Sequence, residues 1–214
     1  MTRRIVTAML AAITILAAGA VPAWAQAAKV AVIDMRDVIE RYVGWQRRIQ
    51  ELNQFRLERE QQYREAVRTA YLTADERARY ADLVRDPAKT VDRWREVFEL
   101  RGKSERIEEE LNFLSKIDDA ELTDTQRTRR DELQTIYDRA KQDLDGLRQR
   151  LNKEIEEKDK TLAEEADTEI RDTIAAYAKE KQYDLVLSKD TVIYGGTDIT
   201  DQVVDRLNKA AGAR

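Results

Sequence analysis

Residues 140–177 read AKQDLDGLRQRLNKEIEEKDKTLAEEADTEIRDTIAAY, and this stretch decides the fold. Its apolar residues recur about every 3.7 positions when Lys158 is counted as a polar member of the series, which is close to the period of an α-helix. The series is Ala140, Leu144, Leu147, Leu151, Ile155, Leu162, Ala166, Ile170, Ile174 and Tyr177. Residues 125–182 contain no proline, so we expect one helix about 87 Å long.

A stripe this narrow cannot stabilise an isolated helix, so a second helix must cover it. Upstream, apolar residues step alternately by four and three positions, as in a coiled coil. These residues are Val38, Tyr42, Trp45, Ile49 and Leu52. The two stripes together predict a long antiparallel helical hairpin over 44–182, which runs out along 37–116 and returns along 124–182.

The helical pattern is interrupted near 72–73, 86–87 and 118–124. The first and third breaks each place Thr three residues before Glu or Gln, the pattern of a capping box that starts a new helix. The second break is Asp86-Pro87, where proline disfavours helix at the preceding residue and lacks an amide donor. We therefore expect several shorter helices on the outward half of the hairpin.

The first and third breaks also resemble each other. Segments 72–83 and 122–133 share Leu, Thr, Arg, Arg and Leu at five of twelve aligned positions. This indicates either an internal duplication or two helix starts that use the same chemistry.

Both ends of the chain are rich in β-branched residues, in contrast to the middle. Residues 30–34 have the pattern of a buried strand, and 183–187 and 191–194 predict two more strands joined by a polar turn. We therefore expect an α+β fold that is mostly α, with a small β-sheet body formed by both chain ends, 26–43 and 183–214.

Residues with short polar side chains, or with none, indicate where the strands end and where the neighbouring helices begin. Asp37 can start the helix that follows the first strand. Gly195-Gly196 ends the last strand, and Asp198 or Thr200 can cap the amphipathic helix after it.

Residues 1–25 have the pattern of a secretory signal peptide. Two arginines precede an apolar run over 5–20, and the small residues Ala23 and Ala25 stand where a signal peptidase reads them. An apolar run of this length is short for a membrane span, which favours cleavage after Ala25 over a membrane anchor. We expect the chain to be exported to the periplasm.

The composition excludes several classes of protein. The chain has 214 residues, with 38 Lys and Arg against 42 Asp and Glu, and it contains neither Cys nor His. Disulfides, thiol catalysis and a Ser-His-Asp triad are therefore excluded. An acidic chain is a poor nucleic-acid binder, because phosphate contacts need clustered Lys and Arg. The carboxylate clusters are interpreted as solvated helix faces and caps, so we expect no enzyme, cofactor or metal site.

Three segments carry a resemblance to a known family. The start at 29–34, the strand pair 183–187 and 192–194, and the ending DITDQVVDRLN at 198–208 resemble the Skp (OmpH-like) family of periplasmic chaperones. The resemblance implies a homotrimer with a small β-body and helical arms around a cavity, which holds unfolded outer-membrane proteins. No ATP-binding motif is present, so holding is expected to be passive. The best-known members of that family are strongly basic, whereas this chain has a formal net charge of −4, which argues against direct membrane contact.

Self-association is also expected from the strands themselves, because a sheet of three short strands has open edges. The apolar residues expected to take part in oligomerisation are Val30, Val32, Ile33, Leu185, Leu187, Val192 and Ile193.

Aromatic side chains are the candidates for contact with an unfolded client. Phe55 falls outside the upstream apolar stripe, and Trp94 and Phe98 form an i, i+4 pair in a segment with few other apolar residues. The alternative is that these side chains close the hairpin seam. A further alternative is that the protein binds no client, and that the helical hairpin serves as a structural coiled-coil spacer of the cell envelope.

Overall fold

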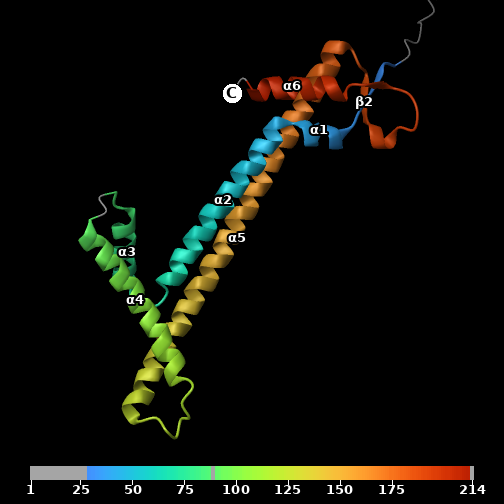
Figure 1. Cartoon of the computed structure of the whole chain (residues 1–214). Helices are drawn as coiled ribbons and strands as arrows, with labels where there is room; N and C mark the ends of the chain where they lie inside the picture. The colour runs from blue at the N-terminus through green and yellow to red at the C-terminus, as the bar shows by residue number, and fades with distance from the viewer. Residues whose placement is uncertain (1–27, 88–89, 213–214) are drawn as a thin grey trace, which may run out of the picture.

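The computed structural model describes residues 28–87 and 90–212, and the expected signal peptide lies outside the described residues. Figure 1 shows an elongated molecule with a small body at one end, a two-helix arm, and a branch that leaves the arm partway along. The fold is mostly helical and carries a small sheet, as the sequence predicts.

The sheet has three short strands, with β1 (Val30–Ile33) between β2 (Leu185–Ser188) and β3 (Thr197–Asp198). Both outer strands run parallel to β1. Val30 lies opposite Leu185, and Val32 lies opposite Leu187. The outer edges of β2 and β3 have no strand partner among the described residues.

The predicted strand at 191–194, and the turn that pairs it with the preceding strand, are wrong. The segment Lys189–Thr191 forms a short 3-10 helix, and Val192 and Ile193 follow it outside the sheet. The side chain of Ile193 is fully exposed. β-propensity describes how well a side chain fits a pleated surface and does not identify the partner strand.

The third strand instead begins after the two glycines. Gly195 and Gly196 have φ angles of 94° and 87°, which only glycine adopts readily. They turn the chain so that β3 pairs with β1 rather than with β2. A side chain on Gly196 would also stand 2.7 Å from a methyl group of Val32, so this close approach requires glycine as well.

The described residues form six helices, which are separated at the three expected breaks and also at Tyr42, where no break was predicted. They are α1 (Met35–Arg41), α2 (Val43–Arg68), α3 (Ala74–Arg85), α4 (Val91–Leu114), α5 (Asp124–Lys181) and α6 (Thr200–Gly212). The long helix α5 contains 58 residues and buries Ala140, Leu151, Leu162, Ala166 and Ile170 from the predicted stripe.

Local chemistry explains where these helices start. Both capping boxes form, at Thr73 before α3 and at Thr123 before α5. The prediction that Asp37 starts α1 is wrong, because the carboxylate of Asp34 accepts the N–H groups of Arg36 and Asp37. The strand therefore passes directly into α1, and Asp34 caps it.

The core of the body lies between the sheet, α1, α6 and the end of α5. Ala31 and Ile33 of β1 pack there with Val38, Val203 and Leu207, which are all almost fully buried. Helix α6 places its apolar residues on one face, which covers this core.

In the arm, α2 and α5 lie side by side and run in opposite directions (Figure 1). Ion pairs join them, and the shortest are Arg48 to Glu169 at 3.0 Å, Glu51 to Lys158 at 2.5 Å, and Arg59 to Glu154 at 2.9 Å. A partly exposed pair contributes about 0.2–1 kcal/mol, whereas a buried Leu or Ile contributes about 1.5–3 kcal/mol. The apolar seam therefore supplies most of the stability of the arm.

The outward half does not follow α5 continuously. Helix α3 and the first half of α4 fold aside as a branch, and only the second half of α4 lies beside the start of α5 (Figure 1). The turn between α2 and α3 is anchored by Leu72, which is 1% exposed. Tyr71 stacks on Tyr137 of α5, with ring centroids 6.4 Å apart.

Candidate functional site

The branch carries an exposed apolar face on α4. Val91, Trp94 and Phe98 are 77%, 37% and 63% exposed, and their spacing of three and four residues places them on one side of the helix. The rings of Trp94 and Phe98 lie 6.0 Å apart between centroids. Together with Arg95, Glu99 and Arg106, these residues line an open groove of about 620 Å³. We call this surface the α4 groove.

The structure thus brings together two of the three aromatic residues predicted to contact a client. Phe55 lies elsewhere, on α2 in the arm, where it is half-buried and the guanidinium of Arg59 lies 4.3 Å from its ring centroid. Arg59 in turn pairs with Glu154 of α5. Phe55 therefore lies against Arg59, one of the residues that join α2 to α5 by ion pairs, and not in the α4 groove.

Val91 begins the α4 groove but was not among the residues predicted to contact a client. It could have been predicted from the sequence, because Val91, Trp94 and Phe98 follow the i, i+3, i+7 pattern of one helix face. Phe113 was also not singled out. It is as exposed as Phe98, at 63%, but it lies at the other end of α4 and does not line the α4 groove.

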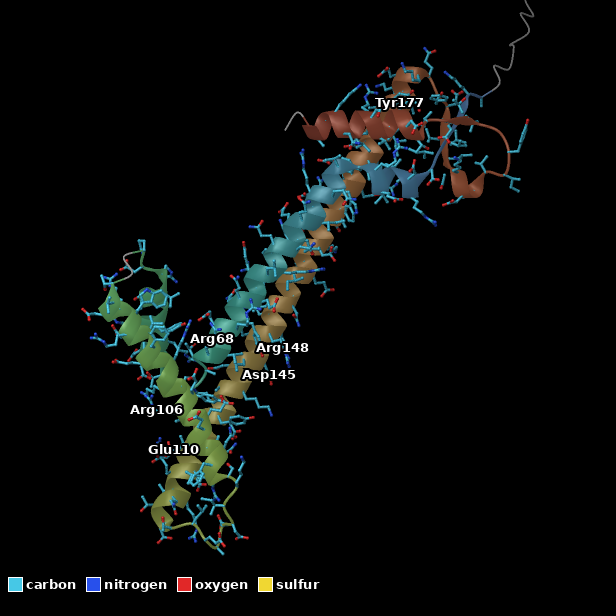
Figure 2. The ribbon with its side chains drawn as sticks, in the orientation of Figure 1. Arg68, Arg106, Glu110, Asp145, Arg148 and Tyr177 are labelled. Atoms are coloured by element: carbon cyan, nitrogen blue, oxygen red, sulfur yellow. The ribbon has the colours of Figure 1, made fainter. Side chains whose placement is uncertain are left out.

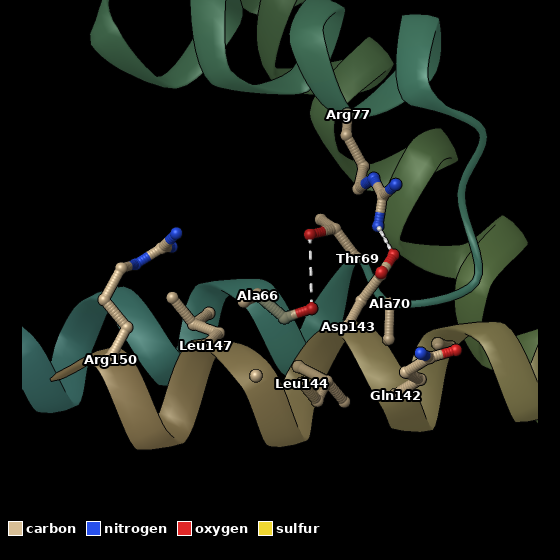
Figure 3. A pocket seen from close by; sticks show the side chains of 11 residues that line it. Ala66, Thr69, Ala70, Arg77, Gln142, Asp143, Leu144, Leu147 and Arg150 are labelled. Carbon is tan, nitrogen blue, oxygen red and sulfur yellow. Dashed lines mark hydrogen bonds and ion pairs between the residues drawn. The ribbon is translucent and has the colours of Figure 1, made fainter. Parts of the chain in front are cut away.

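A second groove, of about 820 Å³, lies where the branch leaves the arm (Figure 3). Ala66 of α2 and Ala70 of the turn after it line one side, and Leu144 and Leu147 of α5 line another. Arg77 of α3 reaches across to Asp143 of α5 at 3.4 Å. This groove separates the branch from the arm.

The sheet offers a third exposed surface, at the edge of β2. Leu185 is 48% exposed, and Leu187 is half-buried. A groove of about 430 Å³ runs beside this strand and is lined mainly by apolar side chains, including Ile33, Ile174 and Val186.

The seven residues expected to take part in oligomerisation differ in exposure. Val32 and Ile33 are buried within the protomer, whereas Val30 and Val192 are half-buried. Leu185 and Ile193 are exposed, so they are the members of the set that most readily reach a neighbour.

Charged groups join the body to the base of the arm. Burial raises the pKa of the Tyr42 hydroxyl, and the carboxylate of Glu169, which accepts its hydrogen bond, raises it further. In the body, hydrogen bonds from Thr200 and then from Lys189 lower the pKa of Asp198 to about 2. These contacts hold the helices of the body and the base of the arm in place.

Side chains that end in oxygen or nitrogen cover the arm and the branch, as the sticks in Figure 2 show. Within residues 28–87 and 90–212, no three Asp or Glu side chains converge as they would around a metal ion. None of the helices formed by these described residues combines the length and apolar character needed to cross a bilayer.

A comparison with curated proteins gives no match. A comparison with protein families matches residues 29–207 to the family described as outer membrane protein (OmpH-like). The match covers both ends of the sheet body, the arm and the branch. The chain belongs to the OmpH-like family, the family to which Skp chaperones belong.

Proposed function

We propose that this protein is a periplasmic, ATP-independent holdase that binds unfolded outer-membrane proteins and prevents their aggregation. The observation that carries the proposal is the α4 groove, where Val91, Trp94 and Phe98 expose apolar surface side by side. Contiguous apolar patches on a soluble protein commonly mark a site of interaction. Membership of the OmpH-like family supports outer-membrane proteins as the class of client.

The proposed assembly is a homotrimer joined through the sheet bodies, with three arms around a cavity. It is supported by the open edge of β2 and by the exposure of Leu185 on that edge. The branch, whose helix α4 carries the groove, lies away from the body (Figure 1).

Holding is proposed to be passive. Aromatic and aliphatic contacts are non-directional, so the same groove can accept many different apolar segments. Each contact is weak, and folding of the client in the outer membrane would draw it away from the groove. This scheme requires neither a cofactor nor a chemical step.

The alternative is a structural coiled-coil spacer without client binding. It is favoured by the charged surface of the arm (Figure 2) and by the ion pairs that join α2 to α5. Such a spacer would leave the α4 groove without a role.

Fluorescence anisotropy of a dye-labelled porin separates these two functions. The porin is unfolded in urea and diluted into residues 26–214 of the chain, without nucleotide. The same porin, already folded in detergent micelles, is the control. A holdase raises the anisotropy of the unfolded porin alone, whereas a spacer leaves both unchanged.

A further inference from the structure

Helix α4 contains two copies of one docking segment. Glu96-Val97 and Leu100 form the first, and Glu110-Leu111 and Leu114 form the second, fourteen residues later. Fourteen residues are close to four helical turns, so both copies lie on nearly the same face of α4, about 21 Å apart. These copies are named the first and the second docking segment.

Two helix starts dock on these segments in the same way. Arg79 of α3 binds Glu96 through two hydrogen bonds of 2.6 and 2.7 Å. Arg129 of α5 binds Glu110 through two of 3.0 and 2.9 Å. Glu110 is labelled in Figure 2.

The apolar contacts match as well. Leu83 of α3 shares an apolar cluster with Val97 and Leu100, and Leu133 of α5 shares one with Leu111 and Leu114. Arg79 and Arg129, like Leu83 and Leu133, occupy equivalent positions in the two similar segments 72–83 and 122–133. The structural equivalence therefore favours an internal duplication over a coincidence of two helix starts.

The two docked helices differ in what holds them. The second docking segment belongs to a cluster that also includes Leu122, Ile107 and Ile117, and its partner continues into the long helix α5. The first docking segment packs in a smaller cluster with α3, a helix of twelve residues.

Much of the attachment of α3 is polar. Glu76 pairs with Lys103, and the hydroxyl of Tyr80 donates to Glu65 and accepts from Arg101 at 2.8 Å. The ion pairs of Glu76 with Lys103 and of Arg79 with Glu96 are partly exposed to solvent, so salt screens them.

We propose that α3 is a releasable clasp on α4, which covers the first docking segment and limits the apolar surface available to an unfolded client. Val97 lies three residues after Trp94, and Leu100 lies three residues after Val97, so both continue the row of side chains that Val91 and Trp94 begin. Release of α3 therefore extends the α4 groove by two aliphatic side chains. This inference rests on the proposed function, because it concerns regulation of the same surface.

Hydrogen exchange measured by mass spectrometry tests the clasp without any client. Arg79→Ala removes the bidentate pair with Glu96, and we expect the amides of α3 to exchange about fivefold faster. Arg129→Ala, the matched change in the other copy, should leave exchange in α3 unchanged. The double exchange Arg79→Glu with Glu96→Arg restores an ion pair and should restore slow exchange. Raising the salt concentration should act on wild-type α3 as Arg79→Ala does.

The same variants are then titrated with the urea-unfolded porin. We expect Arg79→Ala to bind it several-fold more tightly than wild type, and the charge-swapped variant to bind it as wild type does. If α3 exchange is unaffected by Arg79→Ala and by salt, the clasp is refuted while the holdase stands. If exchange rises but affinity does not, α3 opens without regulating the groove, and the proposal is again overturned. Absence of porin binding by every variant refutes the proposed function and the regulation together, whatever the exchange rates show.

Discussion

Phe98 and Phe113 are equally exposed residues of the same helix, yet only Phe98 lies in the α4 groove beside Trp94. Exposure alone therefore does not define the proposed site. What distinguishes Phe98 is the presence of Val91 and Trp94 on the same side of α4, which together form a continuous apolar surface.

This pair of residues provides a matched test. Phe98→Ser should weaken binding of an unfolded porin about tenfold, because part of the burial free energy of an aromatic side chain is lost. Phe113→Ser changes the same residue type at the same exposure and should leave affinity within twofold of wild type. Titration by fluorescence anisotropy measures both. Equal loss in the two variants would mean that general surface apolarity, and not the α4 groove, determines binding.

Asp198 is the residue whose charge most clearly stabilises the body. Its carboxylate accepts the N–H and hydroxyl of Thr200 at the start of α6, at 3.0 and 2.6 Å, and the ammonium of Lys189 at 2.9 Å. These contacts, the Thr200 hydroxyl first, lower the pKa of Asp198 from 3.8 to about 2. Stability from this group is therefore fully present above pH 3.8 and is lost as the pH falls through 2.

Asp198→Asn should reduce the free energy of unfolding by about 1 kcal/mol at pH 7, a value discounted because the side chain is partly exposed. The difference from wild type should be smaller at pH 3, where the unfolded state already binds the proton. Urea unfolding at both pH values and at one protein concentration measures this. A difference that stays constant between pH 7 and pH 3 would show that the charge of Asp198 does not contribute.

Among the elements, helices were predicted from sequence far better than strands. The stripe of α5 and the capping boxes at Thr73 and Thr123 are local patterns, and the structure forms all of them. The strand predicted at 191–194 failed because pairing in a parallel sheet depends on residues distant in sequence. The two glycines that turn the chain into β3 were identified, but as the end of a strand rather than the approach to one.

The pairing of strand β3 with β1 can be tested at the two glycines that precede β3. Gly196→Ala should lower the free energy of unfolding by about 2–3 kcal/mol, because it adds a clash with Val32 to the strain of a positive φ. Gly195→Ala is the control, since its φ is also positive but a Cβ there meets no atom within 4 Å. It should cost about 1 kcal/mol. Equal losses in the two variants would contradict the close approach of Gly196 to β1.

The branch could not be predicted as a branch. The ends of its helices can be predicted from local sequence patterns. The path of α3 away from α5, however, depends on contacts between helices, such as Arg79 with Glu96 and Tyr80 with Arg101. For the same reason the α4 groove was predicted only in part. Trp94 and Phe98 were identified by spacing, whereas Phe55 was grouped with them because its neighbours in space were unknown.

At the scale of the whole molecule, the open edge of β2 predicts assembly through the sheet bodies. Leu185→Lys places a charge on that edge and should convert a trimer to a monomer, because burying an unpaired ammonium in an interface is costly. Val84→Lys, on an exposed position of α3 far from the sheet, should leave the mass unchanged. Native mass spectrometry distinguishes these states. A wild-type monomer, or a Leu185→Lys trimer, would contradict the proposed interface.

The central claim is that the protein keeps unfolded outer-membrane proteins from aggregating without ATP. Light scattering after dilution of a urea-unfolded porin, in the presence of residues 26–214 and without nucleotide, tests it most directly. We expect scattering to fall as the protein is added and to be suppressed near one trimer per porin. Undiminished scattering in the presence of a folded trimer would contradict it and favour the coiled-coil spacer.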